Sequence, residues 1–495
     1  MQYEDSDAPI LEIEDGAVAA VRRGHPCIAW LVIIVLAGGV TYLQNGGRNT
    51  PHPLEDSGTS PQDVIMLLQG RYLVGAAKFA GNQRAMLYDQ AEPLNHGTVE
   101  QRLRFAVLAE ELAGPQRALD VLSDLENRIL QGGVELDDEQ QKLLETETTL
   151  MTDYADGEWD APSLDQSQRE LLKEKLGWFG DLALAPKKGS DAQARASVMR
   201  AAEQTAISLL GTAGLYCLLL MVGVMAWVLF GEAYLSGGSG PVCRCGAASR
   251  AGVYPETFVV WLILFFLLTQ GASLLVQNER YRTLALAAAM FCSLLALVWP
   301  RLRGISWRDI RSDIGWTAGR GPLVEPLFGV GSYVMTIPIL FVGFLACLAL
   351  MLVAGLADPL SGGADDFSPT GLPSHPIIST VANADWFVVV QLYLAAAVAA
   401  PVVEETMFRG VMYRQLRESS ARWGFWASFL FSAFVNAFIF AVIHPQGFIA
   451  VPALVAIALG LTMAREWRGT LIPSMVAHGI HNGLLMTVLL LAIGR

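Results

Sequence analysis

Long apolar runs recur along the chain and dominate its pattern. Each is about 17–25 residues long, the length that a helix needs to cross the hydrocarbon core of a bilayer. Tryptophan or tyrosine stands at many of their ends, as is typical where a helix reaches the lipid headgroups. We therefore predict membrane-spanning helices at residues 27–43, 206–231, 256–276, 283–299, 330–355, 385–402 with its continuation, 425–443, 447–463 and 470–492.

Residues 44–204, between the first two runs, have the opposite pattern. A turn-rich linker opens this segment, and apolar residues then recur every three or four positions, which predicts amphipathic helices. Gly114 and Pro115 break the periodicity and separate two of the helices. Paired short helices are consistent with tetratricopeptide-like hairpins, although we find no clean repeat of about 34 residues. The predicted helices cover 101–112, 119–129, 138–153 and 167–179.

The composition agrees with a membrane protein. Hydrophobic residues make up 53% of the 495 residues and charged residues only 16%, against about 25% in soluble domains. The net charge of −13 argues against nucleic acid as a partner. We predict an all-α fold, a polytopic membrane helix bundle of about nine transmembrane helices with an inserted soluble α-helical domain.

The loops differ in arginine content, which predicts the orientation. Arginines are frequent in the loop after the fourth run, in 409–422 and in 465–468, whereas 356–384 contains neither arginine nor lysine. By the positive-inside rule the N-terminus is cytoplasmic and 44–204 lies outside, in a multi-pass protein of the plasma (inner) membrane. Arg280 and Arg282 are the exception, because in this orientation they face outward.

These features divide the chain into an acidic N-terminal tail (1–26), a transmembrane anchor (27–43), the soluble domain (44–204), three spans (205–299) and a C-terminal membrane domain (300–495). The first run favours an uncleaved anchor over a signal peptide, since it is long and no clear A-x-A site follows it. The soluble domain shows no convincing cluster of catalytic side chains. We expect it to be an acidic helical adaptor that can hold a protein partner.

Two adjacent acids interrupt the sixth run. Glu404 and Glu405 each cost roughly 2.5–3.5 kcal/mol inside a bilayer, so such residues are expected to serve a function. Arg409 lies four residues after Glu405 on the same helix face, an orientation that favours an ion pair. Glu404 is rotated about 100° from Glu405 and is free to face a cavity. A desolvated carboxylate there is suited to act as a general base.

Polar side chains also lie in two later runs. His444 ends its run one turn after Phe440, and Pro445 terminates that helix. His478 and Asn482 are four residues apart and so point the same way. A carboxylate, an imidazole and a His/Asn pair from three helices are the groups needed to activate water and bind an oxyanion.

Straight helices do not bring these side chains to one height in the membrane. Measured from the basic junction at 414–424, Glu404 lies roughly 20 Å, His444 roughly 30 Å and His478 roughly 12 Å into the bilayer. Their convergence requires helix tilt, or a break near Pro401 or within the junction.

Three strings occur in order along these runs: E-E-x-x-x-R at 404–409, F-x-x-x-H at 440–444 and H-x-x-x-N at 478–482. Together they resemble the CPBP intramembrane proteases, also called the Abi or type II CAAX prenyl endopeptidase family. The stretch ISWRDIRSDIGW at 305–316 is similar to an amphipathic lead-in often found there. The resemblance covers 300–495, and the anchor and soluble domain lie outside it.

The resemblance implies a hydrolase that cuts a peptide bond within the membrane. At the matching positions Glu404 activates water, a task that His444 shares. His478 and Asn482 stabilise the tetrahedral oxyanion. The implied substrate is a peptide or protein, which is lipidated in the eukaryotic precedent, and the other partners are membrane lipids. The supporting or substrate-binding positions are Glu405, Arg409 and Phe440.

The sequence leaves metal dependence open. The family is labelled metalloprotease, but a metal-free glutamate mechanism has also been proposed for it. Glu404, His444 and His478 would make a His₂Glu set for a divalent metal such as zinc with an open fourth position, or they act on water directly. No H-E-x-x-H string is present to favour the metal.

Two other classes of function fit the same residues. A proton-coupled membrane transporter also uses buried Glu and His, and predicts flux across liposomes that depends on Glu404 and needs no peptide. A non-catalytic membrane scaffold or immunity protein keeps the fold without turnover, and predicts a phenotype indifferent to Glu404. For His481 and Asn436 we expect only helix-to-helix hydrogen bonds.

Overall fold

All regular elements of the described chain are helices, as predicted. The computed structural model describes residues 24–46, 61–79, 84–132, 135–243, 250, 252–357, 380–381 and 384–493. Residues 1–23 of the predicted acidic tail and most of the linker before the soluble domain lie outside these ranges. The all-α fold class is therefore confirmed for the part of the chain that can be described.

Eight of the described helices are long and apolar enough to cross a membrane. A further helix, α1 (Pro26–Gly46), is apolar over the shorter stretch Pro26–Tyr42. Together they correspond to the nine predicted runs and make this a multi-pass membrane protein. The eight spans are Ala192–Leu235, Val253–Leu275, Glu279–Leu302, Val324–Val353, Trp386–Trp423, Phe425–Val442, Phe448–Arg468 and Ile472–Ile493.

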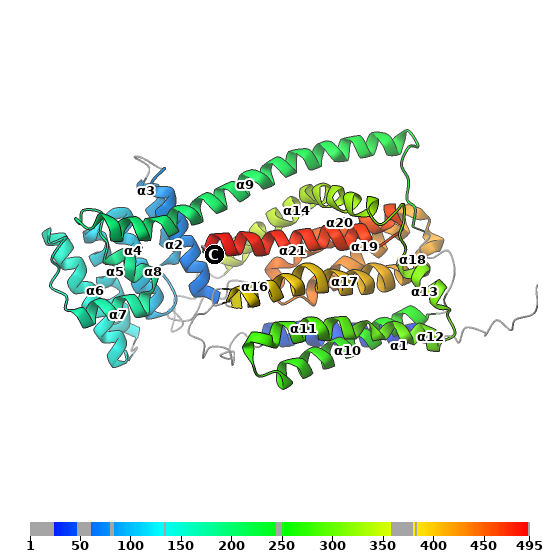
Figure 1. The fold of residues 1–495 in the computed structure, drawn as a ribbon, viewed down its shortest axis with the longest axis horizontal. Helices are drawn as coiled ribbons and strands as arrows, with labels where there is room; N and C mark the ends of the chain where they lie inside the picture. The colour runs from blue at the N-terminus through cyan, green and yellow to red at the C-terminus, as the bar shows by residue number, and fades with distance from the viewer. Residues whose placement is uncertain are drawn as a thin grey trace, which may run out of the picture.

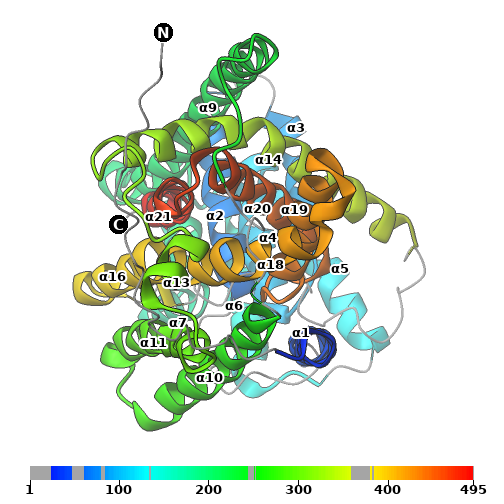
Figure 2. The same ribbon diagram turned by 90° about the vertical axis from the view of Figure 1, so that its right-hand side faces the viewer.

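One span runs through the middle of the bundle. It comprises α16 (Trp386–Tyr393), α17 (Ala400–Glu404) and α18 (Tyr413–Ser420), joined by π-helical turns. Helices α14, α19, α20 and α21 lie on one side of it, and α1, α10 and α11 on the other (Figures 1 and 2). The bounds of these neighbours are α10 (Val253–Leu275), α11 (Glu279–Ser293), α14 (Val324–Ala357), α19 (Phe425–Val442), α20 (Val451–Arg468) and α21 (Ile472–Ile493).

The segment that we predicted to be soluble forms a helical domain at one end of the bundle (Figure 1). A capping box of Thr98 and Gln101 starts the helix predicted at 101–112, and Gly114, at φ +100°, ends it. The helix predicted at 167–179 is divided in two at Gly177. The domain contains α2 (Pro61–Ala77), α3 (Arg84–Ala91), α4 (Val99–Ala113), α5 (Pro115–Gly132), α6 (Asp138–Asp156), α7 (Gln166–Leu176) and α8 (Trp178–Ala183).

Helix α9 (Ala192–Leu235) joins the domain to the membrane without a linker. Its 44 residues start beside α4, where Glu111 accepts hydrogen bonds from Arg195 at 2.8 and 2.9 Å. At 1.5 Å per residue the helix is about 66 Å long, enough to cross both the domain and the bilayer. Position 204, where we predicted the domain boundary, therefore lies inside a continuous helix.

The two ends of the bundle differ in character. Helices α12 (Val298–Leu302), α13 (Trp307–Ile314) and α18 lie at the end remote from the domain (Figure 1), so the arginine-rich segments gather there. The exceptional Arg280 pairs with Asp385, with 3.4 Å between Nη1 and Oδ2. A partner carboxylate thus accounts for a basic residue at the domain end. Which side faces the cytoplasm stays a prediction.

Candidate active site

The central span is π-helical on both sides of Glu404. The wider turns cover Leu394–Ala399 (η6) and Glu405–Met412 (η7), with Pro401 between them. Proline has no N–H to give to a helical carbonyl, so the hydrogen-bond register changes near it. The Ala400 N–H accordingly bonds to the Ala395 carbonyl, five residues back. π-Helical turns inside α-helices are frequent at functional sites.

Asn482 satisfies a carbonyl that this change of register leaves free. In a π-helix the Ala396 carbonyl would pair with the N–H of Pro401, which does not exist. Asn482 Nδ2 donates to this carbonyl at 2.8 Å instead. One of the two Asn482 side-chain N–H groups is therefore used to hold α21 against η6, and the second is the one available to a ligand.

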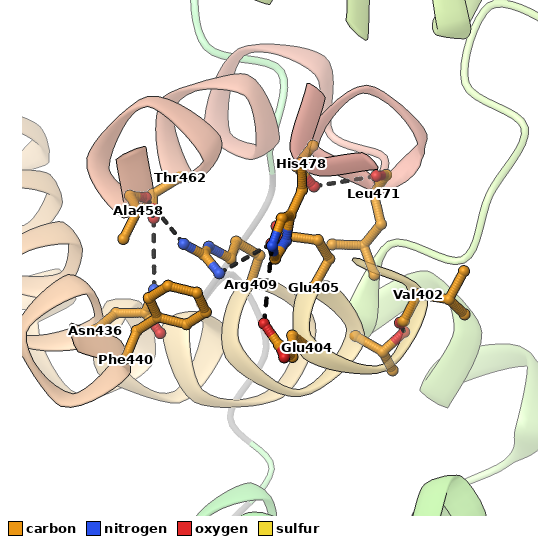
Figure 3. A network of polar contacts seen from close by, with 12 residues as sticks. Val402, Glu404, Glu405, Arg409, Asn436, Phe440, Ala458, Thr462, Leu471 and His478 are labelled. Carbon is orange, nitrogen blue, oxygen red and sulfur yellow. Dashed lines mark hydrogen bonds and ion pairs between the residues drawn. The ribbon is translucent and has the colours of Figure 1, made fainter. Parts of the chain in front are cut away.

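Glu405 and Arg409 form the ion pair expected from their spacing. Arg409 Nη1 lies 2.9 Å from Glu405 Oε1, and both side chains are 0% exposed. Glu405 Oε1 also accepts from His478 Nδ1 at 2.9 Å. Arg409 further donates to the Ala458 carbonyl of α20 at 3.2 Å. Figure 3 shows Glu405 joined to both Arg409 and His478. Through Oε1 this acid connects its own span to α20 and α21, whereas its Oε2 is buried without a hydrogen-bond partner among the described residues.

Glu404 differs from Glu405 in both exposure and partners. Its side chain is 16% exposed, and its Oε2 has no hydrogen-bond partner among the described residues. His444 Nε2 and His478 Nε2 each lie 3.9 Å from this oxygen. Polar atoms 3.9 Å apart are too distant for a direct hydrogen bond but can share a bridging water. Of the two acids, Glu404 is therefore the one able to act on a small molecule.

Phe440 forms a platform under these groups. The Arg409 guanidinium carbon lies 4.6 Å from the centre of its ring, a cation–π contact. The His444 ring also packs against the Phe440 ring at an angle, with 4.2 Å between the ring centres. The Phe440 carbonyl accepts a hydrogen bond from His444 Nδ1 at 2.5 Å. Because the carbonyl can only accept, Nδ1 carries the proton, and Nε2 of a neutral His444 presents its lone pair toward Glu404.

The structure brings the side chains to one level in a way that the straight-helix count did not predict. The helix after Glu404 continues to Trp423, so Gly424 is twenty residues from both Glu404 and His444. The expected height of roughly 20 Å for Glu404 is wrong because that count ended the helix within the junction at 414–424, before Trp423. Both residues lie about 30 Å along their helices.

His478 reaches the same level because the turn before α21 lies deep in the bundle. A Cβ atom on Gly410 would be only 3.4 Å from Leu471 Cδ1, so these two residues lie side by side. Glu404 is six residues before Gly410, and His478 is seven residues after Leu471 on an antiparallel helix. The two side chains therefore meet.

The donor set does not form a metal site as arranged. Among the described residues, no group of three or more His, Cys, Asp or Glu side chains is spaced to hold a metal ion. Ligand atoms about 2.0–2.2 Å from a tetrahedral zinc ion lie about 3.4 Å from one another, closer than the 3.9 Å between Glu404 Oε2 and each imidazole Nε2. We therefore derive no step through a metal.

The expected helix-to-helix role suits one of two residues. Asn436 donates from Nδ2 to Thr462 Oγ1 of α20 at 3.4 Å. His481 Nδ1 is buried without a hydrogen-bond partner among the described residues, and its ring lies 6.0 Å from that of Tyr333. The prediction is therefore wrong for this His481 nitrogen.

The sequence analysis did not identify two groups that help to build the site, a glycine and a backbone carbonyl. Gly479 lies against the Ala397 carbonyl, to which an added Cβ would come within 2.6 Å. The Ala458 carbonyl completes the Arg409 site. Glycine directly after a buried histidine was a signal for the first contact, whereas the sequence holds no signal for a backbone acceptor on another helix.

Comparison with known proteins agrees with this site. Residues 386–484 match the family described as Type II CAAX prenyl endopeptidase Rce1-like. No curated protein matches the chain, and no solved structure matches it. The matched segment contains every side chain of the candidate site and excludes the soluble domain. Over this segment the chain is similar to the CPBP family of CAAX-type membrane proteases.

Proposed function

We propose that the protein is an intramembrane endopeptidase in which Glu404 activates water for attack on a peptide bond. One observation carries the proposal. The unpaired Glu404 Oε2 lies 3.9 Å from the Nε2 atoms of two histidines on two other helices. A water molecule there can donate to the carboxylate and to the His444 lone pair, which leaves an oxygen lone pair for the substrate.

The proposed hydrolysis uses Glu404 and the bound water molecule. As the water oxygen bonds to the carbonyl carbon, its proton passes to the Glu404 carboxylate. The resulting tetrahedral oxyanion collapses, the C–N bond breaks, and Glu404 returns the proton to the leaving amine. The products are a new carboxyl group and a new amine. Glu404 thus serves as base and then as acid in one turnover.

His478 and Asn482 are suited to stabilise the oxyanion. His478 donates from Nδ1 to Glu405, and its Nε2 faces the Glu404 side of the site. A protonated His478 ring donates from Nε2 to the oxyanion, and the Glu405 carboxylate on Nδ1 fixes the orientation of the ring. The second Asn482 N–H supplies another donor. Removing one such donor commonly lowers kcat by about 10²–10³-fold.

The substrate is proposed to be a membrane-associated peptide or protein, including a lipidated one. The matched family is described as a prenyl endopeptidase, and the site lies within membrane-spanning helices. A substrate must therefore reach Glu404 from within the bilayer or from its surface. A partner on the soluble domain, and the plasma membrane as location, remain proposals.

The test compares cells carrying the wild type, Glu404→Gln and His444→Ala. We expect both substitutions to abolish the appearance of new termini in membrane proteins while abundance and insertion stay normal. Glu279→Gln is the matched control, because Glu279 is a 71% exposed acid at the start of α11. Cleavage that persists in Glu404→Gln would contradict the proposal. Peptide-independent proton flux that requires Glu404 would favour the transporter instead.

A further inference from the structure

The extramembrane domain is hydrogen-bonded to the C-terminal end of α21, the helix that carries His478. Two carbonyls at the C-terminus of α21 accept hydrogen bonds, one from the domain and one from the helix that connects the domain to the membrane. Arg71 of α2 donates from Nη1 to the Ile493 carbonyl at 2.9 Å. Thr205 of α9 donates to the Ala492 carbonyl at 2.6 Å and is completely buried.

These contacts satisfy groups that a helix end leaves unpaired. The last four carbonyls of an α-helix have no partner within it, and the end carries a partial negative charge. A guanidinium and a hydroxyl are suitable donors, and the cation also opposes the helix dipole. Arg71 is itself held by the domain, with its guanidinium carbon 5.5 Å from the centre of the Trp178 ring.

The two helices that supply the donors are in backbone contact. A Cβ atom on Gly75 of α2 would lie 2.3 Å from the Ala202 carbonyl of α9, so α2 and α9 touch at this glycine. Helix α9 then continues across the membrane beside α14, where Trp227 donates to the Met335 carbonyl at 2.7 Å. The helices that supply the cap therefore contact each other and the membrane bundle.

A row of polar contacts connects the capped end of α21 to the active site. Thr487 pairs with Tyr393 through their hydroxyls at 2.7 Å, and Asn482 donates to the Ala396 carbonyl at 2.8 Å. His478 then donates to Glu405 at 2.9 Å. All three contacts join α21 to the central span, so a slide of α21 along its axis would lengthen them together.

We propose that the extramembrane domain positions the catalytic helix α21 through this cap, with Arg71 and Thr205 as positioning residues for proteolysis. The inference rests on the proposed function for its catalytic part. It gives the domain, which lies outside the matched family segment, a direct effect on the spacing between His478 and Glu404. A displacement of about 1 Å at such a site can lower the rate by about 10²-fold.

The test uses the full chain in lipid nanodiscs with four variants and a control. Arg71→Met and Thr205→Val remove the donors, whereas Arg71→Lys and Thr205→Ser keep them. Lys78→Met is the matched control, because Lys78 links α2 to α9 through Glu203 at 2.7 Å without touching α21. For each protein we would measure kcat, KM and hydrogen exchange along α21.

We expect the first two variants to lower kcat by about tenfold or more with KM little changed, and to speed exchange in the last turns of α21. The conservative variants and Lys78→Met should behave as the wild type. Unchanged exchange in both donor-removing variants would overturn the cap, and faster exchange with unchanged kcat would overturn the positioning role. If the wild type cleaves nothing, the proposed function fails, while exchange alone still decides whether the domain holds α21. Thr205→Val gives the answer if Arg71→Met does not fold.

Discussion

Replacing Glu405 by alanine should damage the fold more than any other change in the site. Glu405 and Arg409 are both 0% exposed, and Glu405 Oε1 accepts from Arg409 and from His478, each at 2.9 Å. Without the carboxylate, Arg409 keeps, among the described residues, the Ala458 carbonyl at 3.2 Å and the Phe440 ring. Removing one partner of a buried ion pair costs about 3–5 kcal/mol, a large part of a typical folding free energy of about 5–15 kcal/mol.

A double-mutant cycle separates this charge effect from lost packing. Arg409→Met removes the guanidinium that Glu405→Ala leaves unpaired, so the double variant should be less destabilised than the sum of the single variants by about 2 kcal/mol. Reversible unfolding in mixed micelles, followed by tryptophan fluorescence, measures each free energy of unfolding. Additive effects, or a Glu405→Ala protein as stable as the wild type, would refute the reasoning. A stable but inactive Glu405→Ala protein would show that the roles of the two acids are reversed.

Three further predictions follow from particular contacts. Gly479→Ala should lower the free energy of unfolding by about 1–3 kcal/mol and abolish cleavage, since the new Cβ would lie 2.6 Å from the Ala397 carbonyl. Gly483→Ala should be tolerated in the same assays, because the nearest atom to its Cβ would be 3.7 Å away. Equal behaviour of the two variants would contradict the packing argument. Burial and the neighbouring Glu111 raise the pKa of Glu110 to about 7, so the domain should lose about 3 kcal/mol of stability as the pH rises from below 4.5 through 7. Glu110→Gln should remove this loss in thermal melts at several pH values. A pH profile that stays the same in the variant would contradict this assignment. Chelators should leave kcat unchanged, because the donor set is not spaced for a metal, and activity that returns only with added zinc would establish the zinc alternative.

The short-range geometry of the site could be predicted from spacing alone. Residues four apart on a helix share a face, so the Glu405–Arg409 pair and the His444–Phe440 contact are consequences of sequence separation. The high cost of ionisable groups in lipid likewise singled out the correct part of the chain. These inferences require only that the segments are helical.

The long-range geometry could not be predicted in this way. The height of Glu404 depends on where its helix ends, and Arg409, counted among the loop arginines at 409–422, is buried within the span. The π-helical turns around Pro401 free the Ala396 carbonyl, which Asn482 then occupies. A straight-helix count contains neither the extra residue in a wide turn nor the depth of the turn before α21.

In the helical domain, too, the local structure was predictable and the long-range contacts were not. Gly114 and Pro115 marked the end of one of its helices in the sequence, whereas Thr98 caps the start of that helix two residues before the predicted one. Its attachment through a continuous α9, and the contacts of Arg71 and Thr205 with α21, join segments more than 280 residues apart. Local periodicity carries no information about such pairs.

The activation of water by Glu404 is tested most directly by isotope incorporation. Purified wild type and Glu404→Gln proteins in nanodiscs would be incubated in H₂¹⁸O with a library of membrane-inserting and lipidated peptides, and the products weighed by mass spectrometry. We predict that the wild type yields fragments with one ¹⁸O in each new carboxyl group and that Glu404→Gln yields none. Labelled fragments from Glu404→Gln at the wild-type rate would contradict the account.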